Sequence, residues 1–584
     1  MNEKTEPHSL TPTERDRRVL ELCEQVSEIE GRLIPTGLHV FGRASDETER
    51  ADLLRMVASF DRPEANARAL PSLIKTGLAS NSATRLEPEG AAGEQTLAAR
   101  EQVDAITREA VRRFLRDGTI GACAWLETAA HVSPLESRPV FAVLEKITEG
   151  LRNNQELDAF MRALRGEYIE PGPGADIVQN PNVLPTGRNT HAVNPYAVPS
   201  EVAYTRAERL VKLLLERHLA EHGRYPAAMA LVLWGLDNIK TQGEGVAQAL
   251  WLLGVRPVRD AMNRVTDVEA ISLERLGRPR IDVVMTVSGI FRDLFGATMA
   301  LLDKAVRCVA ALDEPTESNY VRRNIREQMD ATACEFDEAA LRVFSNAPGN
   351  YGTNVNFMVM DSQWEADDAL ADLFVTRKCF AYGRDSTTGR MLEGREARGA
   401  LNSALARVEA TYQNIDSFEI GITDVDHYFE YLGGVSKAVE KQAASRPAIY
   451  LSDALSPEAK VRSVEETIRL ETRTKTLNPK WYEGMLKHGF RGVAEIESHV
   501  ANTFGWSATA DAVDDWVYRE VAETFVLDEG MLERLRGLNP HSARSLVARL
   551  LEAEGRGFWQ AETGIVERLR DIFTGLEDQL EGIA

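Results

Sequence analysis

The chain has 584 residues, with 68 lysines and arginines against 90 aspartates and glutamates, and a formal net charge of −22. Hydrophobic residues make up 43% and charged residues 27%, a composition that excludes long intrinsic disorder for most of the chain. A field of this sign repels nucleic-acid backbones and anionic membrane surfaces, so neither is the expected partner. One hydrophobic core does not support a chain of this length, and we expect roughly three or four domains.

The cysteines and the apolar segments predict a reduced, cytoplasmic protein. Five cysteines are spread singly with no CxxC pair, which disfavours a disulfide framework or a structural zinc site. Residues 1–20 lack the apolar core of a signal peptide, and the longest apolar run, near 227–234, is far shorter than a membrane span. We therefore expect no transmembrane segment.

The first 165 residues are expected to form a helical region. The spacing of apolar residues predicts helices over 11–30, 50–59, 101–116 and 139–165. Residues 79–95 are rich in Ser, Ala, Gly and Glu and are expected to be a surface loop. Residues 166–200 hold so many prolines and glycines that we interpret them as a connector.

The pattern changes after a helix predicted from about 200 to 221. Residues 227–234 form a short apolar run followed by a polar loop and a helix, and 281–287 repeat this plan. Such alternation is typical of a parallel α/β layer, which we assign to an α/β domain over 201–360. Ligands of such sheets bind at the carboxyl ends of the strands, where the loops 235–244 and 288–293 are expected.

From about residue 362 the chain is expected to be a mainly helical C-terminal region, 361–584. Polar loops are predicted at 413–427, 474–485 and 504–515, and a Gly/Asn-rich loop at 345–356. The predicted fold class is α/β plus α: multidomain and mostly helical, with a central parallel α/β layer. No P-loop is present, so ATP hydrolysis by that route is not expected of this chain.

Several predicted loops concentrate polar side chains beside Gly, Trp or Tyr. Each of them alone is more often an ordinary solvated loop, and a lone histidine such as His39 is more often a core or capping group. Composition and periodicity therefore lead to a large α/β protein without naming a reaction. The loops are 237–244, 292–293, 345–351, 424–428, 478–483 and 505–507.

Long motifs at these loops resemble the large porphyrin-binding subunit shared by magnesium chelatase and cobaltochelatase. The resemblance covers almost the whole chain, most strongly 165–584. The family's large subunit is about twice as long, and this chain resembles its C-terminal half. The motifs are RLIPTGLHVFG (32–42), GEYIEPGPGAD (166–176), VLPTGRNTHAVNPYAVPS (183–200), YPAAMALVLWGLDNIKTQGEGVAQALWLLGVRPV (225–258), LGRPRIDVVMTVSGIFRDLF (276–295), LNPKWYEGMLKHGFRGVAEI (477–496) and NTFGWSAT (502–509).

Within that family, the residues resemble the H subunit of magnesium chelatase more than the cobalt enzyme. The chain departs from the common pattern at Leu236, where Thr is usual, at Gln242, where Tyr is usual, and at Asn194, where an acidic residue is usual. The segments that favour magnesium are His191, DNIKT (237–241), ITDVDHYF (422–429) and NPKWYEGM (478–485).

The resemblance implies insertion of Mg²⁺ into protoporphyrin IX, on the way to chlorophyll or bacteriochlorophyll, while AAA+ and integrin-like partner subunits hydrolyse ATP. Two pyrrole protons must leave the ring, and Mg²⁺ prefers oxygen ligands, so a carboxylate near the ring is needed. On the resemblance, Glu30 is the first choice for that carboxylate, and Glu30 with His39 would receive the metal. His39, His191 and Glu244 are the further catalytic candidates.

The ring itself needs cations for its propionates and aromatic faces for stacking. Each aromatic candidate is equally well a core residue. Two alternatives stay open: a cobaltochelatase large subunit, which inserts Co²⁺ into a corrin ring, and a non-catalytic porphyrin-binding protein. The expected ring-binding residues are Arg188, Asp237, Lys240, Arg292, Trp481 and Trp506.

Overall fold

The computed structural model describes two compact units, which we treat separately: residues 1–34 with 39–191 (unit 1), and residues 35–38 with 192–584 (unit 2). None of the helices in the described part of the chain is long and apolar enough to cross a membrane. The described residues are all except 1–14, 16–17, 20–21, 23–24, 27, 30–31, 33, 36, 63–64, 82–91, 175–176, 179, 191–193, 367, 386–387, 416, 418, 454–458 and 584.

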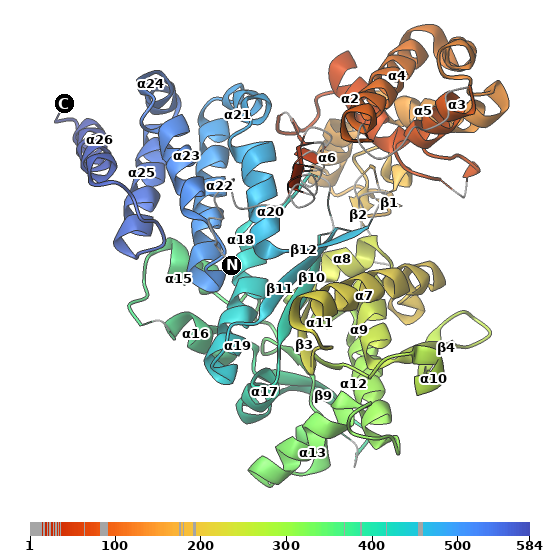
Figure 1. The fold of residues 1–584 in the computed structure, drawn as a ribbon, viewed down its shortest axis with the longest axis vertical. Helices are drawn as coiled ribbons and strands as arrows, with labels where there is room; N and C mark the ends of the chain where they lie inside the picture. The colour runs from red at the N-terminus through yellow and green to blue at the C-terminus, as the bar shows by residue number, and fades with distance from the viewer. Residues whose placement is uncertain are drawn as a thin grey trace. The chain divides into compact units, whose positions relative to one another are not determined.

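Unit 1 is helical, as its sequence predicts (Figure 1). The predicted helix 11–30 falls largely outside the described residues. The loop expected at 79–95 is helical at both ends, since one helix ends at Asn81 and the next begins at Ala92, and residues 82–91 lie outside the described residues. The single helix expected over 139–165 is two, because the chain turns at 153–155. The elements are α2 (Glu47–Ala58), α3 (Leu70–Asn81), α4 (Ala92–Ala130), α5 (Pro134–Arg152), α6 (Glu156–Leu164), β1 (Pro171–Gly172), η2 (Pro181–Val183) and β2 (Asn189–Thr190).

Unit 2 is built on an eight-stranded sheet with the order β12-β11-β10-β3-β6-β7-β8-β9. The five strands from β11 to β7 are parallel, while β12, β8 and β9 pair antiparallel at the two edges, so the sheet is mixed. The strands are β3 (Ala228–Leu233), β6 (Asp282–Val287), β7 (Val343–Ser345), β8 (Phe380–Arg384), β9 (Met391–Glu396), β10 (Ala410–Ile415), β11 (Ala448–Asp453) and β12 (Lys460–Ser463); β4 (Val255–Arg259) and β5 (Val265–Ala270) form a separate hairpin.

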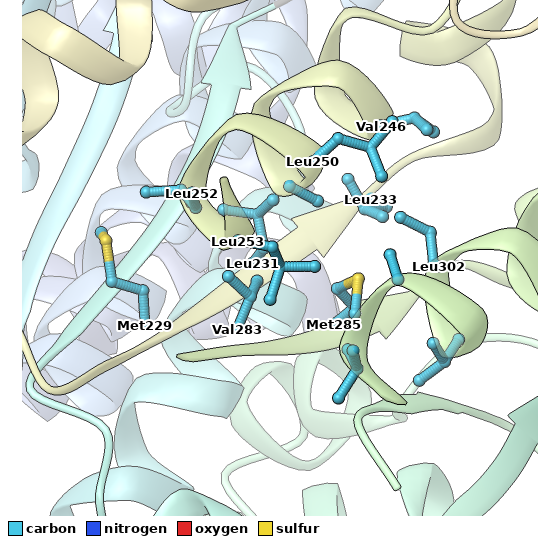
Figure 2. Close-up of a cluster of buried hydrophobic side chains, with 14 of the residues drawn as sticks. Met229, Leu231, Leu233, Val246, Leu250, Leu252, Leu253, Val283, Met285 and Leu302 are labelled. Atoms are coloured by element: carbon cyan, nitrogen blue, oxygen red, sulfur yellow. The ribbon is translucent and has the colours of Figure 1, made fainter. Parts of the chain in front are cut away.

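Both faces of the central strands are covered, because every residue of β3 and β6 is buried. On one face Met229, Leu231 and Leu233 of β3 pack under α9 (Glu244–Leu253), and α12 (Gly296–Ala311) adds Leu302 to the same core (Figure 2). On the other face the hydroxyl of Thr411 in β10 hydrogen bonds that of Ser436 in α19 (Gly434–Ala443). The sheet is thus fixed as a rigid platform.

The other elements of unit 2 include a block of helices in which α22, α23, α25 and α26 lie side by side (Figure 1). They are η3 (Pro195–Ala197), α7 (Glu201–His222), α8 (Gly235–Lys240), α10 (Leu273–Leu276), α11 (Gly289–Leu294), α13 (Tyr320–Thr332), α14 (Phe336–Ala339), α15 (Val355–Met360), α16 (Ala369–Lys378), α17 (Arg398–Leu405), α18 (Asp426–Tyr428), η4 (Phe429–Gly433), α20 (Val464–Glu471), η5 (Thr472–Thr476), α21 (Pro479–Leu486), α22 (Phe490–Ala510), α23 (Asp515–Phe525), α24 (Glu529–Leu538), α25 (Pro540–Gly555) and α26 (Thr563–Glu581); η4 and η5 are π-helical turns.

The predicted fold class is confirmed, and three predicted loops are wrong. The loop expected at 413–427 begins inside β10, and the sheet takes five of its strands, β8 to β12, from beyond residue 361. The loop expected at 474–485 is mostly helix, because Pro479 stands in the first turn of α21 with Asn478 as its cap. The loop expected at 504–515 is largely the end of α22, where Trp506 is buried.

Candidate functional site

The order of the strands defines a switch point in the sheet of unit 2. β3 is the first strand of the sheet in the chain; β6 and β7 lie on one side of it, and β10 and β11 lie on the other. The connections that leave β3 and β10 therefore diverge, and this opens the position where such sheets bind ligands. The segments at the carboxyl ends of β3 and β6 include four of the predicted site residues, which are Asp237, Lys240 and Glu244 after β3 and Arg292 after β6.

Asp237 belongs to a buried polar network that joins the strands. Its Oδ2 accepts a hydrogen bond from Asn414 Nδ2 at 3.2 Å. Asn414 in turn accepts from Gln248 Nε2 at 2.9 Å and from Ser452 Oγ at 2.8 Å. Asn414 thus joins α8, α9, β10 and β11, and Asp237 contributes the bond from α8, which is a structural role at the carboxyl edge. Lys240 is partly exposed at the end of α8.

Glu244 is the first residue of α9 and is 2% exposed. Burial raises the pKa of its carboxyl group to about 7, and Arg206 lowers it only in part. In the described part of the chain no donor hydrogen bonds its carboxylate. A carboxyl group that titrates near neutral pH is suited to accept and release protons.

Arg292 holds the next loop through main-chain contacts. Its Nη1 donates to the carbonyl oxygens of Ala347 at 2.9 Å and Asn350 at 2.8 Å, and its Nε donates to Asp293 Oδ1 at 2.7 Å. Nη2 is buried and has no hydrogen-bond partner among the described residues. Because this nitrogen is buried, the predicted contact of Arg292 with a propionate stays a prediction.

A histidine–glutamate pair lies on the segment that follows β10. His427 Nδ1 is 2.8 Å from Glu430 Oε2, and the side chains are 62% and 1% exposed. Burial opposes ionisation of Glu430, but His427 and the amides of Thr353 and Asn354 hold its pKa below the ordinary value. The hydrogen bond to Glu430 raises the pKa of His427. The pair orients the ring and leaves Nε2 for solvent or a ligand.

An aromatic and cationic cluster adjoins this pair. The ring of Trp234, which follows β3, lies 4.4 Å from that of Tyr431 and 6.4 Å from that of His427. Lys378 is fully buried, and its Nζ donates to Val287 O and Asn346 Oδ1, both at 2.9 Å. Burial drives the pKa of Lys378 well below its ordinary value. The cluster thus packs tilted aromatic rings beside polar groups at this edge of the sheet.

Trp481 and Trp506 lie in the interior of the helical block and are 1% and 0% exposed. Trp506 Nε1 donates to Ile422 O at 2.9 Å, and the Trp481 ring packs edge-on against His499 at 4.4 Å. His499 Nε2 is in turn 2.7 Å from Asp424 Oδ1. The structure therefore places both tryptophans as core residues near this buried histidine–aspartate contact, and their stacking on a ring stays a prediction.

In unit 1, His39 belongs to a second histidine–glutamate pair. His39 Nε2 is 3.2 Å from Glu156 Oε2, and the side chains are 66% and 7% exposed. Glu156 also accepts a hydrogen bond from Gly42 N at 2.6 Å and one from the hydroxyl of Thr186. Burial opposes its ionisation, but these groups outweigh it and lower its pKa. A buried carboxylate thus presents an exposed histidine in each unit.

The guanidinium group of Arg188 hydrogen bonds main-chain carbonyl oxygens. Its guanidinium donates to the carbonyl oxygens of Asn182 at 2.6 Å, Leu184 at 3.1 Å and Pro185 at 3.3 Å. It also lines a cavity of about 540 Å³ in unit 1. Glu30 and His191 lie outside the described residues, so their expected roles stay predictions.

The sequence alone does not predict Glu156 or Glu430 as site residues, and it does not single out His427 within its polar segment. The loop 424–428 is polar as predicted, but nothing in it identifies His427 over its neighbours. The signal that could have found Glu430 is a glutamate three residues after a histidine, which places both on one helical face. Glu156 stands 117 residues from His39, and no local pattern joins them.

The described residues include no group of three or more His, Cys, Asp or Glu side chains arranged to hold a metal ion. The carboxyl edge of the sheet instead combines the buried carboxyl group of Glu244, whose pKa is about 7, with an unpaired buried guanidinium nitrogen of Arg292 and the neighbouring rings of Trp234 and Tyr431.

Comparisons with known proteins agree with the motifs. A model of the family described as CobN/Magnesium Chelatase matches residues 2–565. The chain is 42% identical over 603 residues to magnesium-chelatase subunit ChlH, chloroplastic, of Oryza sativa subsp. japonica, covering 98% of this chain and 43% of that protein. It is 37% identical over 578 residues to the magnesium-chelatase H subunit of Chlorobaculum parvum, covering 96% and 44%.

A solved structure, the catalytic subunit of cobaltochelatase from Mycobacterium tuberculosis, matches with a TM-score of 0.87 and 31% identity. The match covers 99% of this chain and 47% of that chain. The chain therefore spans less than half the length of these relatives. The resemblance read from the motifs is confirmed by these matches.

Proposed function

Because the chain belongs to the CobN/magnesium chelatase family, we propose that it is the porphyrin-binding catalytic part of a magnesium chelatase. It inserts Mg²⁺ into protoporphyrin IX, in the cytoplasm, in the synthesis of chlorophyll or bacteriochlorophyll. AAA+ and integrin-like partner subunits hydrolyse the ATP. The observation that carries the proposal is 42% identity to a magnesium-chelatase subunit over 98% of this chain.

The chemistry needs proton acceptors and a way to hold the ring. Two pyrrole protons leave while Mg²⁺ gives up water reluctantly, so carboxylates and histidines near the ring lower the barrier. Glu244, with a pKa of about 7, accepts one proton at neutral pH. The exposed nitrogen of His427 receives a proton or the incoming ion. Arg292, in α11 after β6, binds a propionate, a role that rests on the resemblance.

Residues from the motifs complete the proposal. Glu30 is the first carboxylate for metal transfer, with His39 nearby in the sequence, and His191 is a further acid–base group. Lys240 and Arg188 contribute positive charge toward propionates, and Trp481 and Trp506 shape the region behind the site. These roles rest on the resemblance.

One second function has a specific observation in its favour. The solved structure that matches with a TM-score of 0.87 is a cobaltochelatase subunit, which supports Co²⁺ insertion into a corrin ring as the alternative. A non-catalytic porphyrin-binding protein is the third candidate, and absence of turnover in the reconstitution would select it.

The test is reconstitution of the chain with the two partner subunits, ATP and protoporphyrin IX. We expect fluorescence of the magnesium porphyrin to appear with Mg²⁺ and no metallated product with Co²⁺. Glu244→Gln should slow metallation while porphyrin affinity stays within a few-fold, and Glu495→Gln, an acid of the helical block outside the proposed site, serves as the matched control.

Each other outcome selects a different function. Metallation of a corrin ring with Co²⁺, and none of protoporphyrin with Mg²⁺, would favour the cobalt enzyme. Tight porphyrin binding without turnover under every condition would favour the non-catalytic protein.

A further inference from the structure

One helix face in unit 1 is apolar and exposed. Along α6, Leu157, Phe160, Met161 and Leu164 occupy positions i, i+3, i+4 and i+7, so they form one stripe along the helix. Their exposed fractions are 54%, 51%, 51% and 66%, and Glu156 is the one buried residue of this fully described helix. A contiguous exposed stripe of this kind marks a binding surface.

The loop that carries His39 extends this stripe. The ring of Phe41 lies 5.9 Å from that of Phe160 in an edge-to-face arrangement and is itself 57% exposed. Gly42 adopts a φ of +77°, and a Cβ there would lie 2.4 Å from Leu157 Cγ, so the loop is pressed against α6. Phe41 and the four residues of α6 therefore form one surface, which we name the α6 stripe.

The two borders of the α6 stripe differ in chemistry. A rotation of roughly 100° per residue places Glu156, with its partner His39, along the side of Phe160. The same rotation places Arg162 and Arg165 along the side of Met161. The stripe thus has a histidine–carboxylate pair on one border and two guanidinium groups on the other.

The cationic border opens into the cavity of about 540 Å³. Arg162, Arg165 and Arg188 line it together with the acids Asp158 and Glu170, which leaves three positive against two negative groups. The side chains of Arg162 and Arg165 are 47% and 55% exposed and share the single carboxylate of Glu167. Their remaining donors are available to an acidic group of a ligand.

We propose that the α6 stripe binds the face of a dicarboxylic tetrapyrrole, with a carboxylate of the ligand seated at the Arg162–Arg165 border. A flat apolar ring with acidic groups along one edge matches an apolar stripe with arginines along one edge. Polypeptide partners would not require cations on a single border. This inference rests on the proposed function and adds a surface of unit 1 to which the ring binds.

The test is titration of the full chain with protoporphyrin IX, followed by quenching of tryptophan fluorescence. Phe160→Ser should weaken binding roughly tenfold, because about half of an aromatic side chain becomes buried on binding. Ile120→Ser is the matched control, since Ile120 is 77% exposed on α4 of the same unit. It should bind as the wild type does.

A second ligand tests the cationic border. Arg165→Gln should weaken binding of protoporphyrin IX several-fold and leave binding of its dimethyl ester unchanged, because the ester has no carboxylate to pair. Equal weakening of both ligands would overturn the assignment of a carboxylate to this border.

The outcomes separate this inference from the proposed function. Wild-type binding with an unchanged Phe160→Ser variant overturns the α6 stripe and leaves the proposed function standing. If Ile120→Ser weakens porphyrin binding as much as Phe160→Ser does, the porphyrin adsorbs nonspecifically, and the α6 stripe proposal is also overturned. A change from dimer to monomer in Phe160→Ser, at constant porphyrin affinity, assigns the stripe to a second copy. Absence of binding by the wild type overturns both proposals.

Discussion

Exchange of Glu430 for glutamine tests whether the Glu430 carboxylate raises the pKa of His427, because the glutamine keeps the other hydrogen bonds of this side chain. Glu430 Oε1 accepts the amides of Thr353 and Asn354 and the hydroxyl of Thr353, whereas Oε2 faces His427 Nδ1. In Glu430→Gln the amide oxygen keeps the first set of bonds and the amide nitrogen faces His427. The histidine then loses a charged acceptor, and its pKa should fall toward the ordinary value of about 6.5.

The magnitude follows from the kind of hydrogen bond that is lost. Charged acceptors contribute about 1 kcal/mol more than neutral ones, so Glu430→Gln should lower the free energy of unfolding by roughly that amount. Because the pKa of His427 is raised, the histidine stabilises the fold below about pH 6.5, and this stabilisation is lost as the pH rises. Because the pKa of Glu430 is lowered, the glutamate stabilises the fold above about pH 4.5, and this stabilisation is lost as the pH falls. The difference between the wild type and the variant should be largest between about pH 4.5 and 6.5.

Glu471→Gln is the matched control. Glu471 is also buried, and it accepts the amides of Ile422 and Thr423 on different oxygens, each at 2.9 Å. A glutamine must point its amide nitrogen at one of these donors, which costs about 1–3 kcal/mol. Carbon-13 labelling of histidine gives the pKa of His427, and urea unfolding gives the stability. An unchanged His427 pKa in Glu430→Gln, or a lowered one in Glu471→Gln, would refute the reasoning.

Three further predictions follow from buried groups. Glu244→Gln should stabilise the protein by up to about 3 kcal/mol at pH 8 and not at pH 4.5. The reason is that the raised pKa makes ionisation of Glu244 costly in the folded state. An equal change in the free energy of unfolding at both pH values would contradict this. Arg342→Met should cost about 3–5 kcal/mol in urea unfolding, because it leaves Asp282 buried without its bidentate partner. Leu302→Ala should cost about 2–5 kcal/mol, since Leu302 is fully buried between α12 and the sheet; a loss below about 1 kcal/mol would mean that the core collapses around the gap.

The strands that the sequence predicts are mostly apolar: β3 is wholly apolar, and β6 has only Asp282 and Thr286 as polar residues. β3 and β6 are located to within one residue at each end, because buried parallel strands read as continuous apolar runs. β10 is missed because Gln413 and Asn414 make it look like a polar loop. The side-chain oxygens of Gln413 and Asn414 accept hydrogen bonds from Trp234 and Gln248, which come from distant parts of the chain. Local composition does not report such partners.

The site residues also divide into those that the sequence predicts and those that it does not. Glu244 and Arg292 follow strands that the sequence locates, so their place at the carboxyl edge is predictable from spacing. Glu430 is not, because its amide partners, Thr353 and Asn354, lie 77 and 76 residues earlier. It also stands in a π-helical turn, a rare element without a sequence pattern of its own.

Glycines from two of the motifs lie against the start of α6 near Glu156, a residue that belongs to neither motif. Gly42, from RLIPTGLHVFG, donates its amide to Glu156 at 2.6 Å. Gly187, from VLPTGRNTH, has a φ of +91°, and a Cβ there would lie 2.8 Å from the amide nitrogen of Glu156. Any side chain at either glycine would push its loop away from the start of α6. The motifs therefore act as scaffolding that brings His39 to a buried carboxylate, and a search confined to the motifs finds the histidine but not the group that orients it.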